Sequence, residues 1–279
     1  MLVFPNCKIN IGLIVSGKRT DGYHNIETIF YPLPFNDALE IIPSRDPKPS
    51  PAAGFTHSGI LIDGEEKDNL CIKAYQILKR DFPQLPAVQI HLHKAIPIGA
   101  GLGGGSADAA FTLTALNEKY TLHLSHQQLL NYALELGSDC PFFIINKPCM
   151  ATGRGEILKP LNLNLSGYRL ILVNPAIPVN TGWAFSQLKI DGKTNLHQSL
   201  QAIVSQPISS WREALGNDFE SPVFEKHPAI KDIKETLYEK GALFASMSGS
   251  GSSVFGLFEK EISPSFHFPE NYLTRSLLL

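Results

Sequence analysis

The sequence predicts a protein in which helices and strands are mixed along the chain. Two segments, 6–13 and 88–92, alternate apolar and polar residues with period two, which indicates strands. Two others, 69–78 and 125–136, place apolar residues at helical spacing and begin with residues that cap helices well. The 279 residues are 43% hydrophobic, enough to fill one large domain or two ordinary ones.

The composition excludes several classes of partner. A net charge of −2 gives no electrostatic basis for binding nucleic acid or an anionic membrane. No apolar run approaches the roughly 20 residues of a membrane span, and residues 1–5 do not resemble a signal peptide. Four cysteines lie scattered in apolar segments without metal-binding spacing. We therefore expect reduced, buried thiols in a cytoplasmic protein.

The remaining elements have weaker signals. Ser125 opens a capping box, and Gly137 ends the helix that follows it. We expect a proline-rich loop at 43–54 and a strand at 168–174. Two helices are expected at 195–204 and 229–240, and two short strands at 242–247 and 253–258. The Ser-Gly segment between the short strands fits a hairpin turn. The tail 263–279 predicts no function.

The stretch 97–107 contains five glycines and joins a strand-like run to a helix-like run. Glycines allow positive φ angles and let a ligand approach the backbone closely. Ser106 follows them and is expected to be the N-cap of the next helix. Unpaired amides and the positive end of the helix dipole would then meet at one place, which favours phosphate binding.

Other interpretations of this loop fit less well. It lacks the Gly-Lys-Ser/Thr ending of a P-loop nucleotide-binding protein. Gly99, Gly101 and Gly104 match the dinucleotide-binding spacing, but no acidic residue ends a second strand about 20 positions later. A flexible linker would be polar on both sides, whereas this loop joins two apolar elements.

Three further motifs have both a structural and a functional interpretation. Lys8 and Asn10 lie on the polar side of strand 6–13, which fits the solvated face of an edge strand. Tyr23 and His24 follow an Asp-Gly turn and would ordinarily be packing residues. Asp139 precedes a proline at the start of a predicted helix, where aspartate is commonly an N-cap.

Taken together, these motifs resemble the GHMP kinases, the family of galactokinase, homoserine kinase and mevalonate kinase. The glycine loop resembles their central phosphate-binding motif. The matching motifs are Pro5-x-x-Lys8-Ile9-Asn10, Arg19-x-Asp21-Gly22-Tyr23-His24 and Gly137-x-Asp139-x-Pro141-Phe142-Phe143. The resemblance runs from Pro5 to Phe258. The second motif resembles the signature of one branch of the family, which phosphorylates a small cytidyl-linked sugar alcohol in non-mevalonate isoprenoid biosynthesis.

The resemblance implies an α+β fold, the GHMP kinase fold. Its N-terminal domain is similar to domain 2 of ribosomal protein S5 and would cover 1–155. A ferredoxin-like domain would cover 156–279, with the active site in the cleft between the two. The family turn at 152–156 lies near this junction. In the family, the loop at 248–252 packs against the phosphate loop, and the turn at 217–220 is structural.

The resemblance also implies that ATP is the co-substrate and that Mg²⁺ accompanies it. The residues that match the phosphate loop are Pro97, Ile98, Gly99, Ala100, Gly101, Leu102, Gly103, Gly104, Gly105, Ser106 and Ala107. Asn69 matches a residue beside the adenine, although a helix cap explains it equally well. Ser106 is the candidate metal contact. Many relatives have a second serine at the position of Ala107, where this chain keeps only the backbone amide.

Asp139 matches the family's catalytic aspartate, the base for the acceptor hydroxyl, and Lys8 matches the lysine that assists it. The substrate-side matches are Asn10, Tyr23, His24, Thr181 and Phe185. By resemblance, Tyr23 stacks on the cytosine ring and His24 hydrogen-bonds the base. Phe185 is either a second stacking surface or an ordinary core residue.

Two other functions stay open on the sequence alone. One is a GHMP kinase for another small alcohol, such as mevalonate or homoserine, although the intact Tyr23-His24 motif disfavours it. The other is a catalytically silent nucleotide-binding module, which the pairing of Lys8 with Asp139 disfavours. We expect a monomer or a weak homodimer that binds a small-molecule substrate, without nucleic acid or membrane.

Overall fold

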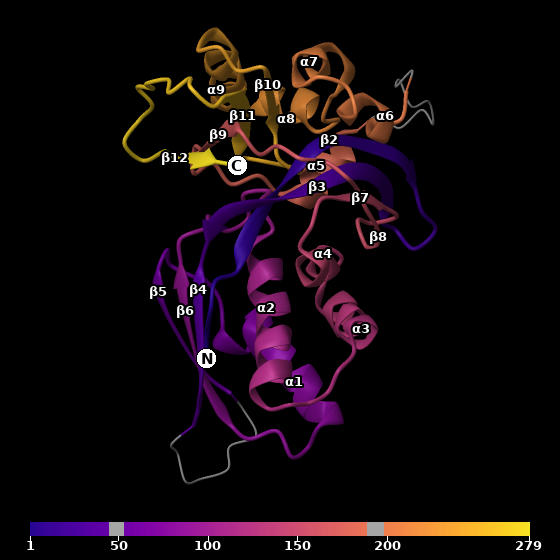
Figure 1. The fold of residues 1–279 in the computed structure, drawn as a ribbon, viewed down its shortest axis with the longest axis vertical. Helices are drawn as coiled ribbons and strands as arrows, with labels where there is room; N and C mark the ends of the chain where they lie inside the picture. Colours follow the sequence, from indigo (N-terminus) through magenta and orange to yellow (C-terminus); the bar gives the residue numbers. More distant parts are fainter. Residues whose placement is uncertain (45–52, 189–197) are drawn as a thin grey trace. The chain divides into compact units, whose positions relative to one another are not determined.

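The computed structural model describes residues 1–44, 53–188 and 198–279, and the chain divides into two compact units (Figure 1). Unit 1 contains residues 1–7, 35–98 and 103–146, and unit 2 contains 8–34, 99–102 and 147–279. Both units combine helices with strands, which confirms the predicted mixed class. The division into domains 1–155 and 156–279 stays a prediction.

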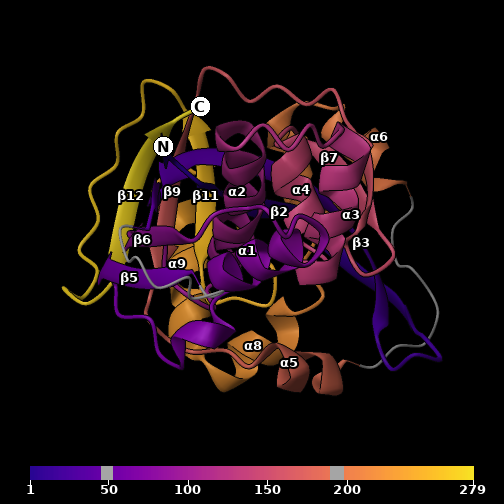
Figure 2. The same cartoon turned by 90° about the horizontal axis from the view of Figure 1, so that it is seen from below.

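Unit 1 consists of a sheet with helices packed on one face. The strand order is β1-β4-β6-β5, antiparallel except for the parallel pair β5 and β6. Helices α1 and α2 lie side by side, and α3 and α4 pack against α2 (Figure 2). The bounds are β1 Leu2–Val3, β4 Ala38–Pro43, β5 Gly54–Gly59, η1 Glu66–Asp68, α1 Leu70–Asp81, β6 Val88–Lys94, α2 Gly104–Lys119, α3 His126–Leu136 and α4 Cys140–Ile145.

The core of unit 1 follows the predicted periodicities. Val88, Ile90 and Leu92 on β6 are buried, whereas the residues between them are exposed. They meet the apolar stripe of α1, which includes Tyr75 and Leu78, and the inner face of α2. The alternating strand and the helical stripe therefore bury their apolar faces in one cluster.

The helix termini of unit 1 test the capping predictions. The Asn69 side chain accepts a hydrogen bond from the amide of Cys71 at 2.9 Å, and Ser125 forms the expected capping box. Gly137 ends α3 as predicted. Ser106 is not an N-cap, because α2 begins two residues earlier and Gly103 is its N-cap with a φ of +68°. A glycine in this left-handed conformation starts the helix before the serine.

Unit 2 contains a second sheet, of order β10-β11-β9-β12 with antiparallel pairing throughout. Helices α8 and α9 cover one face, where Ile230, Ile233 and Leu237 enter the core (Figure 1). The bounds are β9 Tyr168–Asn174, α5 Thr181–Gln187, α6 Leu200–Val204, η2 Ile208–Ser210, α7 Trp211–Ala214, α8 Glu220–Lys226, α9 Pro228–Glu239, β10 Phe244–Met247, β11 Val254–Glu259 and β12 Leu273–Leu278.

Most predicted elements of unit 2 are confirmed. The strand at 168–174, the helix at 229–240 and the hairpin of β10 and β11 are all present within a residue or two. The predicted helix 195–204 corresponds to α6, but residues 189–197 lie outside the described residues, as do 45–52 of the predicted loop 43–54. The tail, for which nothing was predicted, supplies the edge strand β12.

A third sheet has the order β2-β3-β7-β8. Its bounds are β2 Asn6–Lys18, β3 His24–Asn36, β7 Cys149–Thr152 and β8 Ile157–Pro160. β2 is an edge strand of this sheet, as expected. Its polar face is not solvated, however, since Lys8 is 4% and Asn10 2% exposed. Buried polar side chains need partners, and these define the site below.

The four cysteines are all buried, and none is disulfide-bonded, as predicted. Burial raises the pKa of the Cys140 thiol to about 12 and that of Cys149 to about 11. It also raises the pKa of Cys71. Within the described ranges, no helix has the length and apolar character needed to cross a membrane.

Candidate active site

The glycine loop is shared by the two units. Residues 97–98 and 103–107 belong to unit 1, and 99–102 belong to unit 2. Gly99, Gly101 and Gly103 have φ angles of +65°, +77° and +68°. These left-handed conformations favour glycine strongly, so the backbone path explains three of the five glycines.

In unit 2, the loop packs against the turn between β10 and β11. A Cβ on Gly101 would lie 1.9 Å from the carbonyl oxygen of Ser248, so only glycine fits. The Ser248 hydroxyl donates to the Gly101 carbonyl at 2.8 Å, and the Ser253 amide donates to the Ala100 carbonyl at 3.2 Å. The expected packing of loop 248–252 against the glycine loop is confirmed.

Lys8 and Asn10 lie at this same junction. The Lys8 ammonium donates to the Asn10 side-chain oxygen at 2.5 Å and to the Gly101 carbonyl at 3.2 Å. It also lies 4.8 Å from the centre of the Phe30 ring. The Asn10 amide nitrogen donates to the Thr28 hydroxyl at 3.1 Å, which fixes the orientation of Asn10. A buried ammonium is thus held beside the glycine loop.

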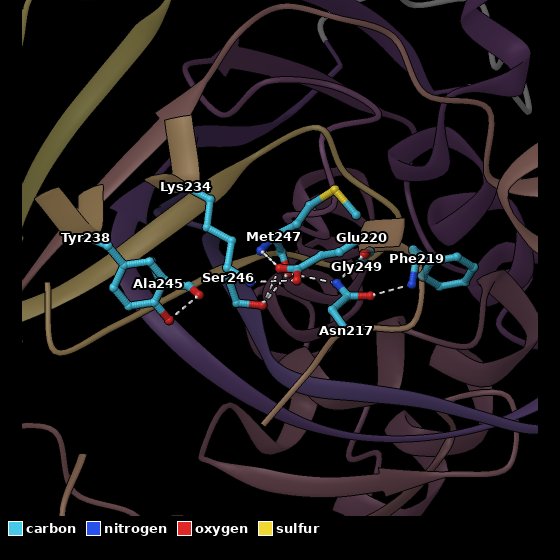
Figure 3. A network of polar contacts seen from close by, with 9 residues as sticks. All are labelled: Asn217, Phe219, Glu220, Lys234, Tyr238, Ala245, Ser246, Met247 and Gly249. Atoms are coloured by element: carbon cyan, nitrogen blue, oxygen red, sulfur yellow. Dashed lines mark hydrogen bonds and ion pairs between the residues drawn. The ribbon is translucent and has the colours of Figure 1, made fainter. Parts of the chain in front are cut away.

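A polar network formed by Asn217, Glu220 and Lys234 supports the 248–252 loop and the end of β10 (Figure 3). The Asn217 amide donates to the carbonyls of Met247 and Gly249, both at 2.8 Å. Glu220 accepts from the Met247 amide at 2.9 Å and pairs with Lys234 at 2.6 Å. The structural role predicted for the 217–220 turn is confirmed, and its effect is to position a loop that touches the glycine loop.

In unit 1, the loop becomes the first turn of α2. Gly104 has no left-handed φ, but a Cβ there would lie 2.9 Å from Ile96 Cγ2 and 3.2 Å from Lys94 Nζ. The first amides of a helix have no intrahelical carbonyl to bond, so those of Gly104 to Ser106 suit a phosphate. The Ala107 amide donates to the Gly103 carbonyl at 2.9 Å, so it is engaged in the helix, contrary to expectation.

Asp139 occupies the N-cap position of α4, as expected for an aspartate two residues before a proline. Its side chain makes no capping hydrogen bond. The thiol of the next residue, Cys140, hydrogen-bonds the Ser106 side chain. The first turn of α2 and the start of α4 therefore lie together in unit 1. Asp139 is in unit 1 and Lys8 in unit 2, and their convergence stays part of the proposal below.

The predicted substrate-side residues besides Asn10 are grouped in unit 2. His24 stacks parallel to Phe185, with ring centres 4.5 Å apart and an interplanar angle of 11°. Tyr23 is 56% exposed, and the Arg154 guanidinium lies 4.7 Å from its ring centre. The Thr181 hydroxyl is 2.8 Å from that of Ser250. The stacked pair of His24 and Phe185 is thus observed, and the base-binding role of these residues stays a prediction.

His24 is suited to recognise a neutral base edge. Burial lowers the pKa of His24 below its usual value, and the nearby Lys18 adds to this effect. The uncharged imidazole, which has one donor and one acceptor nitrogen, is therefore favoured at neutral pH. Asn69 uses its side-chain oxygen as a helix cap, and its contact with adenine stays a prediction.

Sequence reasoning missed two groups of charged residues. Lys94, Asp37 and Asp108 form a buried ion cluster in unit 1. Lys94 follows Val88, Ile90 and Leu92 in the inward phase of β6, and that phase was the available signal. Arg154, in the family turn at 152–156, packs on the Tyr23 ring, for which the sequence held no signal.

The comparisons with known proteins agree with this arrangement. Residues 69–147 match the family model of the GHMP kinases N terminal domain, and 199–265 match that of the GHMP kinases C terminal. A 4-diphosphocytidyl-2-C-methyl-D-erythritol kinase of Bacteroides fragilis is 53% identical over 94% of this chain and 93% of its own. That of Parabacteroides distasonis is 50% identical over 98% and 96%.

A solved structure extends the likeness to the fold. The crystal structure of a 4-(cytidine 5'-diphospho)-2C-methyl-D-erythritol kinase matches with a TM-score of 0.77 and 32% identity, covering 92% of this chain and 90% of that chain. The α+β GHMP kinase fold implied by the motifs is confirmed. The chain belongs to the GHMP kinase family, in the branch of the 4-diphosphocytidyl-2-C-methyl-D-erythritol kinases.

Proposed function

We propose that the protein transfers the γ-phosphoryl group of ATP to the C2 hydroxyl of 4-diphosphocytidyl-2-C-methyl-D-erythritol. The product is the 2-phosphate, an intermediate of isopentenyl diphosphate biosynthesis by the non-mevalonate pathway. Family membership supports the kinase activity. The observation that carries the site assignment is the Lys8 ammonium, buried and fixed 3.2 Å from the Gly101 carbonyl of the glycine loop.

ATP is held by the loop 97–106. The amides of Gly104, Gly105 and Ser106 begin α2 and point out of its N-terminus, where the helix dipole adds positive potential. Gly105 is exposed and accessible to a phosphate. Asn69 lies beside the adenine. Because Gly104 and Gly105 have no side chain, the phosphates can approach the backbone directly.

The transfer needs alignment and charge stabilisation more than covalent chemistry. Asp139 accepts the proton of the C2 hydroxyl. The hydroxyl oxygen forms a bond to the γ-phosphorus, while the bond between the γ-phosphorus and the β,γ-bridging oxygen breaks and ADP leaves. Lys8 stabilises the charge on the transferred group and on the attacking oxygen. Asn10 orients Lys8 through their 2.5 Å hydrogen bond and contacts the acceptor.

Mg²⁺ fits the donor groups of this site. Within residues 1–44, 53–188 and 198–279, no group of three or more His, Cys, Asp or Glu side chains is arranged to hold a metal. Mg²⁺ commonly binds through substrate phosphates and only one or two protein groups, and the Ser106 hydroxyl is the proposed protein contact. When bound there, Mg²⁺ would offset the negative charge of the phosphate oxygens.

The cytidine end of the acceptor binds at the aromatic group of unit 2. Tyr23 offers an exposed ring for stacking on cytosine, and Phe185 lies beside His24 as a second aromatic surface. His24 hydrogen-bonds the base edge in its neutral form, and Thr181 adds a polar contact. A site built on such hydrogen bonds rejects acceptors that lack them, since buried polar groups would be left unpaired.

Residues 1–155 are the proposed ATP-binding domain, and 156–279 are the proposed substrate-side domain. The enzyme acts in the cytoplasm as a monomer or a weak homodimer. It has neither nucleic acid nor membrane as a partner, in line with its net charge of −2.

A phosphoryl-transfer assay tests the proposal. Purified protein with ATP, Mg²⁺ and the cytidyl acceptor is expected to form ADP, whereas mevalonate and homoserine are not phosphorylated. Asp139→Asn should lower kcat by about 10²- to 10⁴-fold, the usual contribution of a general base, while an ATP analogue still binds. Asp232→Asn, on an exposed position of α9, is the matched control and keeps full turnover. Turnover by Asp139→Asn near the wild-type rate would remove Asp139 from the role of base.

A further inference from the structure

Unit 1 contains a buried cluster of three charged side chains, Lys94, Asp37 and Asp108. The Lys94 ammonium bonds both carboxylates, at 2.9 Å to Asp108 Oδ2 and through a shorter contact to Asp37 Oδ2. The three side chains are 3%, 0% and 5% exposed. None of them belongs to the catalytic or nucleotide-binding groups assigned above.

The two carboxylates are connected to opposite ends of the glycine loop. Asp37 Oδ1 accepts hydrogen bonds from the amides of Ala95 and Ile96, at 2.6 and 2.9 Å, directly before the loop. Asp108 lies in α2, two residues after Ser106. Lys94 therefore ties the residues that enter the loop to the helix that leaves it.

Stability alone does not explain this cluster. Desolvation of buried charges offsets most of their attraction, so an apolar core would serve as well. Two carboxylates also share one ammonium, and Asp108 Oδ1 has no hydrogen-bond partner among the described residues. Burial raises the pKa of Asp108 to about 7, with Asp37 reinforcing the shift and Lys94 opposing it. Burying these three charges therefore costs free energy, and their position between the two ends of the glycine loop indicates a positioning role.

We propose that Lys94, with Asp37 and Asp108, positions the phosphate-binding turn by fixing the spacing between residue 96 and the first turn of α2. The inference rests on the proposed role of the glycine loop in holding ATP. Gly104 fits this role because a Cβ there would meet Lys94 Nζ at 3.2 Å and Ile96 Cγ2 at 2.9 Å. The N-terminus of α2 thus packs directly against Lys94, and this contact fixes the position of the first amides of the helix.

The test compares nucleotide and acceptor kinetics in Lys94 variants. Lys94→Met is expected to raise KM for ATP by about 10²-fold, as displaced binding groups do, and to leave KM for the acceptor within about twofold. Lys94→Met leaves two buried carboxylates without a counter-ion. A triple variant that adds Asp37→Asn and Asp108→Asn removes those charges and protects the fold. The triple variant should still show a KM for ATP at least about tenfold above wild type.

The control is Leu78→Ala, a cavity in the core of the same unit on α1, away from the loop. It should lower the melting temperature and leave KM for ATP unchanged. A wild-type KM for ATP in the triple variant would overturn the proposal, and so would an equal rise in Leu78→Ala. Both outcomes would show that the cluster acts only through stability.

A loop variant separates this proposal from the proposed function. Gly101→Ala introduces a clash with the Ser248 carbonyl, and its affinity for a non-hydrolysable ATP analogue is measured beside that of the triple variant. Weakened binding in both supports the positioning role. Weakened binding in Gly101→Ala alone overturns the role of the cluster. Unchanged binding in both overturns the role of the loop in holding ATP as well.

Discussion

Two lysines of this protein are equally hidden from water, yet their surroundings differ. Lys8 in unit 2 is 4% exposed, and Lys94 in unit 1 is 3% exposed. In its own unit Lys8 contacts an amide oxygen, a backbone carbonyl and an aromatic ring. Lys94 contacts two carboxylates. The two carboxylates neutralise the Lys94 ammonium and fix its position.

The comparison shows that burial does not by itself identify a catalytic lysine. What separates the two lysines is position. Lys8 bonds the Gly101 carbonyl within the glycine loop, whereas Lys94 bonds Asp37 and Asp108, which contact the residues before the loop and the helix after it. Mutations of the two lysines should therefore act on different measurements, and the predictions below rank them by size.

The largest change is expected in the stability of Lys94→Met. Removing the ammonium leaves Asp37 and Asp108 buried and opposed, which typically costs about 3–5 kcal/mol. Urea unfolding at pH 7 measures the loss. Replacing Asp37 and Asp108 by asparagine in the same protein should recover much of this loss, because no buried carboxylate is then left without a counter-ion. An equal loss in the triple variant would contradict this electrostatic origin.

The second prediction concerns turnover. Lys8→Met should lower kcat by about 10²- to 10³-fold, the usual result of removing one group that stabilises transition-state charge. Its KM values should change little. Single-turnover kinetics with saturating ATP and acceptor measure the effect. If kcat fell no further than in Lys94→Met, Lys8 would have no special part in the chemistry.

The third prediction uses pH. The pKa of Asp108 in the folded protein is raised by burial from 3.8 to about 7, so the folded state binds more protons than the unfolded state between these values. Stability from this group therefore falls as pH rises from about 4 to 7 and stays low above that. Lys94, Asp37 and Cys71 are the titratable groups that face Asp108.

Asp108→Asn removes this titration. Relative to wild type, the variant should gain about 2 kcal/mol of unfolding free energy between pH 5 and pH 8, from about 1.4 kcal/mol per pH unit reduced by coupling within the cluster. Urea unfolding across this range measures the difference. A constant difference between the two proteins at every pH would contradict the raised pKa.

The smallest effect is expected at a third cation, Arg154, which lies over the exposed Tyr23 ring and also pairs with Glu156 at 3.6 Å. Its contact with Tyr23 should contribute about 0.5–1 kcal/mol, the range for exposed cation–π pairs. Arg154→Gln should therefore raise KM for the cytidyl acceptor about threefold, whereas Tyr23→Ala should raise it by about tenfold or more through lost stacking. KM for ATP should not change in either variant. An equal rise in both KM values would misplace the cytidine site.

The fold was predictable where the signal is local. Strand β6, the stripe of α1 and the caps at Asn69 and Ser125 depend on neighbours within a few residues, and periodicity finds them. One error arose where local preference met a stronger constraint, since Gly103 starts α2 before Ser106 because the left-handed turn is there. Of the two interpretations of the polar face of β2, the solvated one is excluded, because this face is buried.

The site was predictable as a set of residues but not as an arrangement. The motifs that resemble a family identified Lys8, Asn10 and the glycine loop. Ser248 reaches Asn10 across 238 residues, which no periodicity reveals. The ion cluster joins positions 37, 94 and 108 from three elements, and the edge strand β12 lacks regular alternation in its sequence.

The buried thiols give the protein an internal reporter of its own opening. Only a thiolate reacts with an alkylating reagent, and burial raises the pKa of Cys140 to about 12. Iodoacetamide should therefore modify the native protein only through transient exposure of its interior. Mass spectrometry of the labelled chain would then read two regions at once, with Cys71 and Cys140 reporting on unit 1 and Cys149 on unit 2.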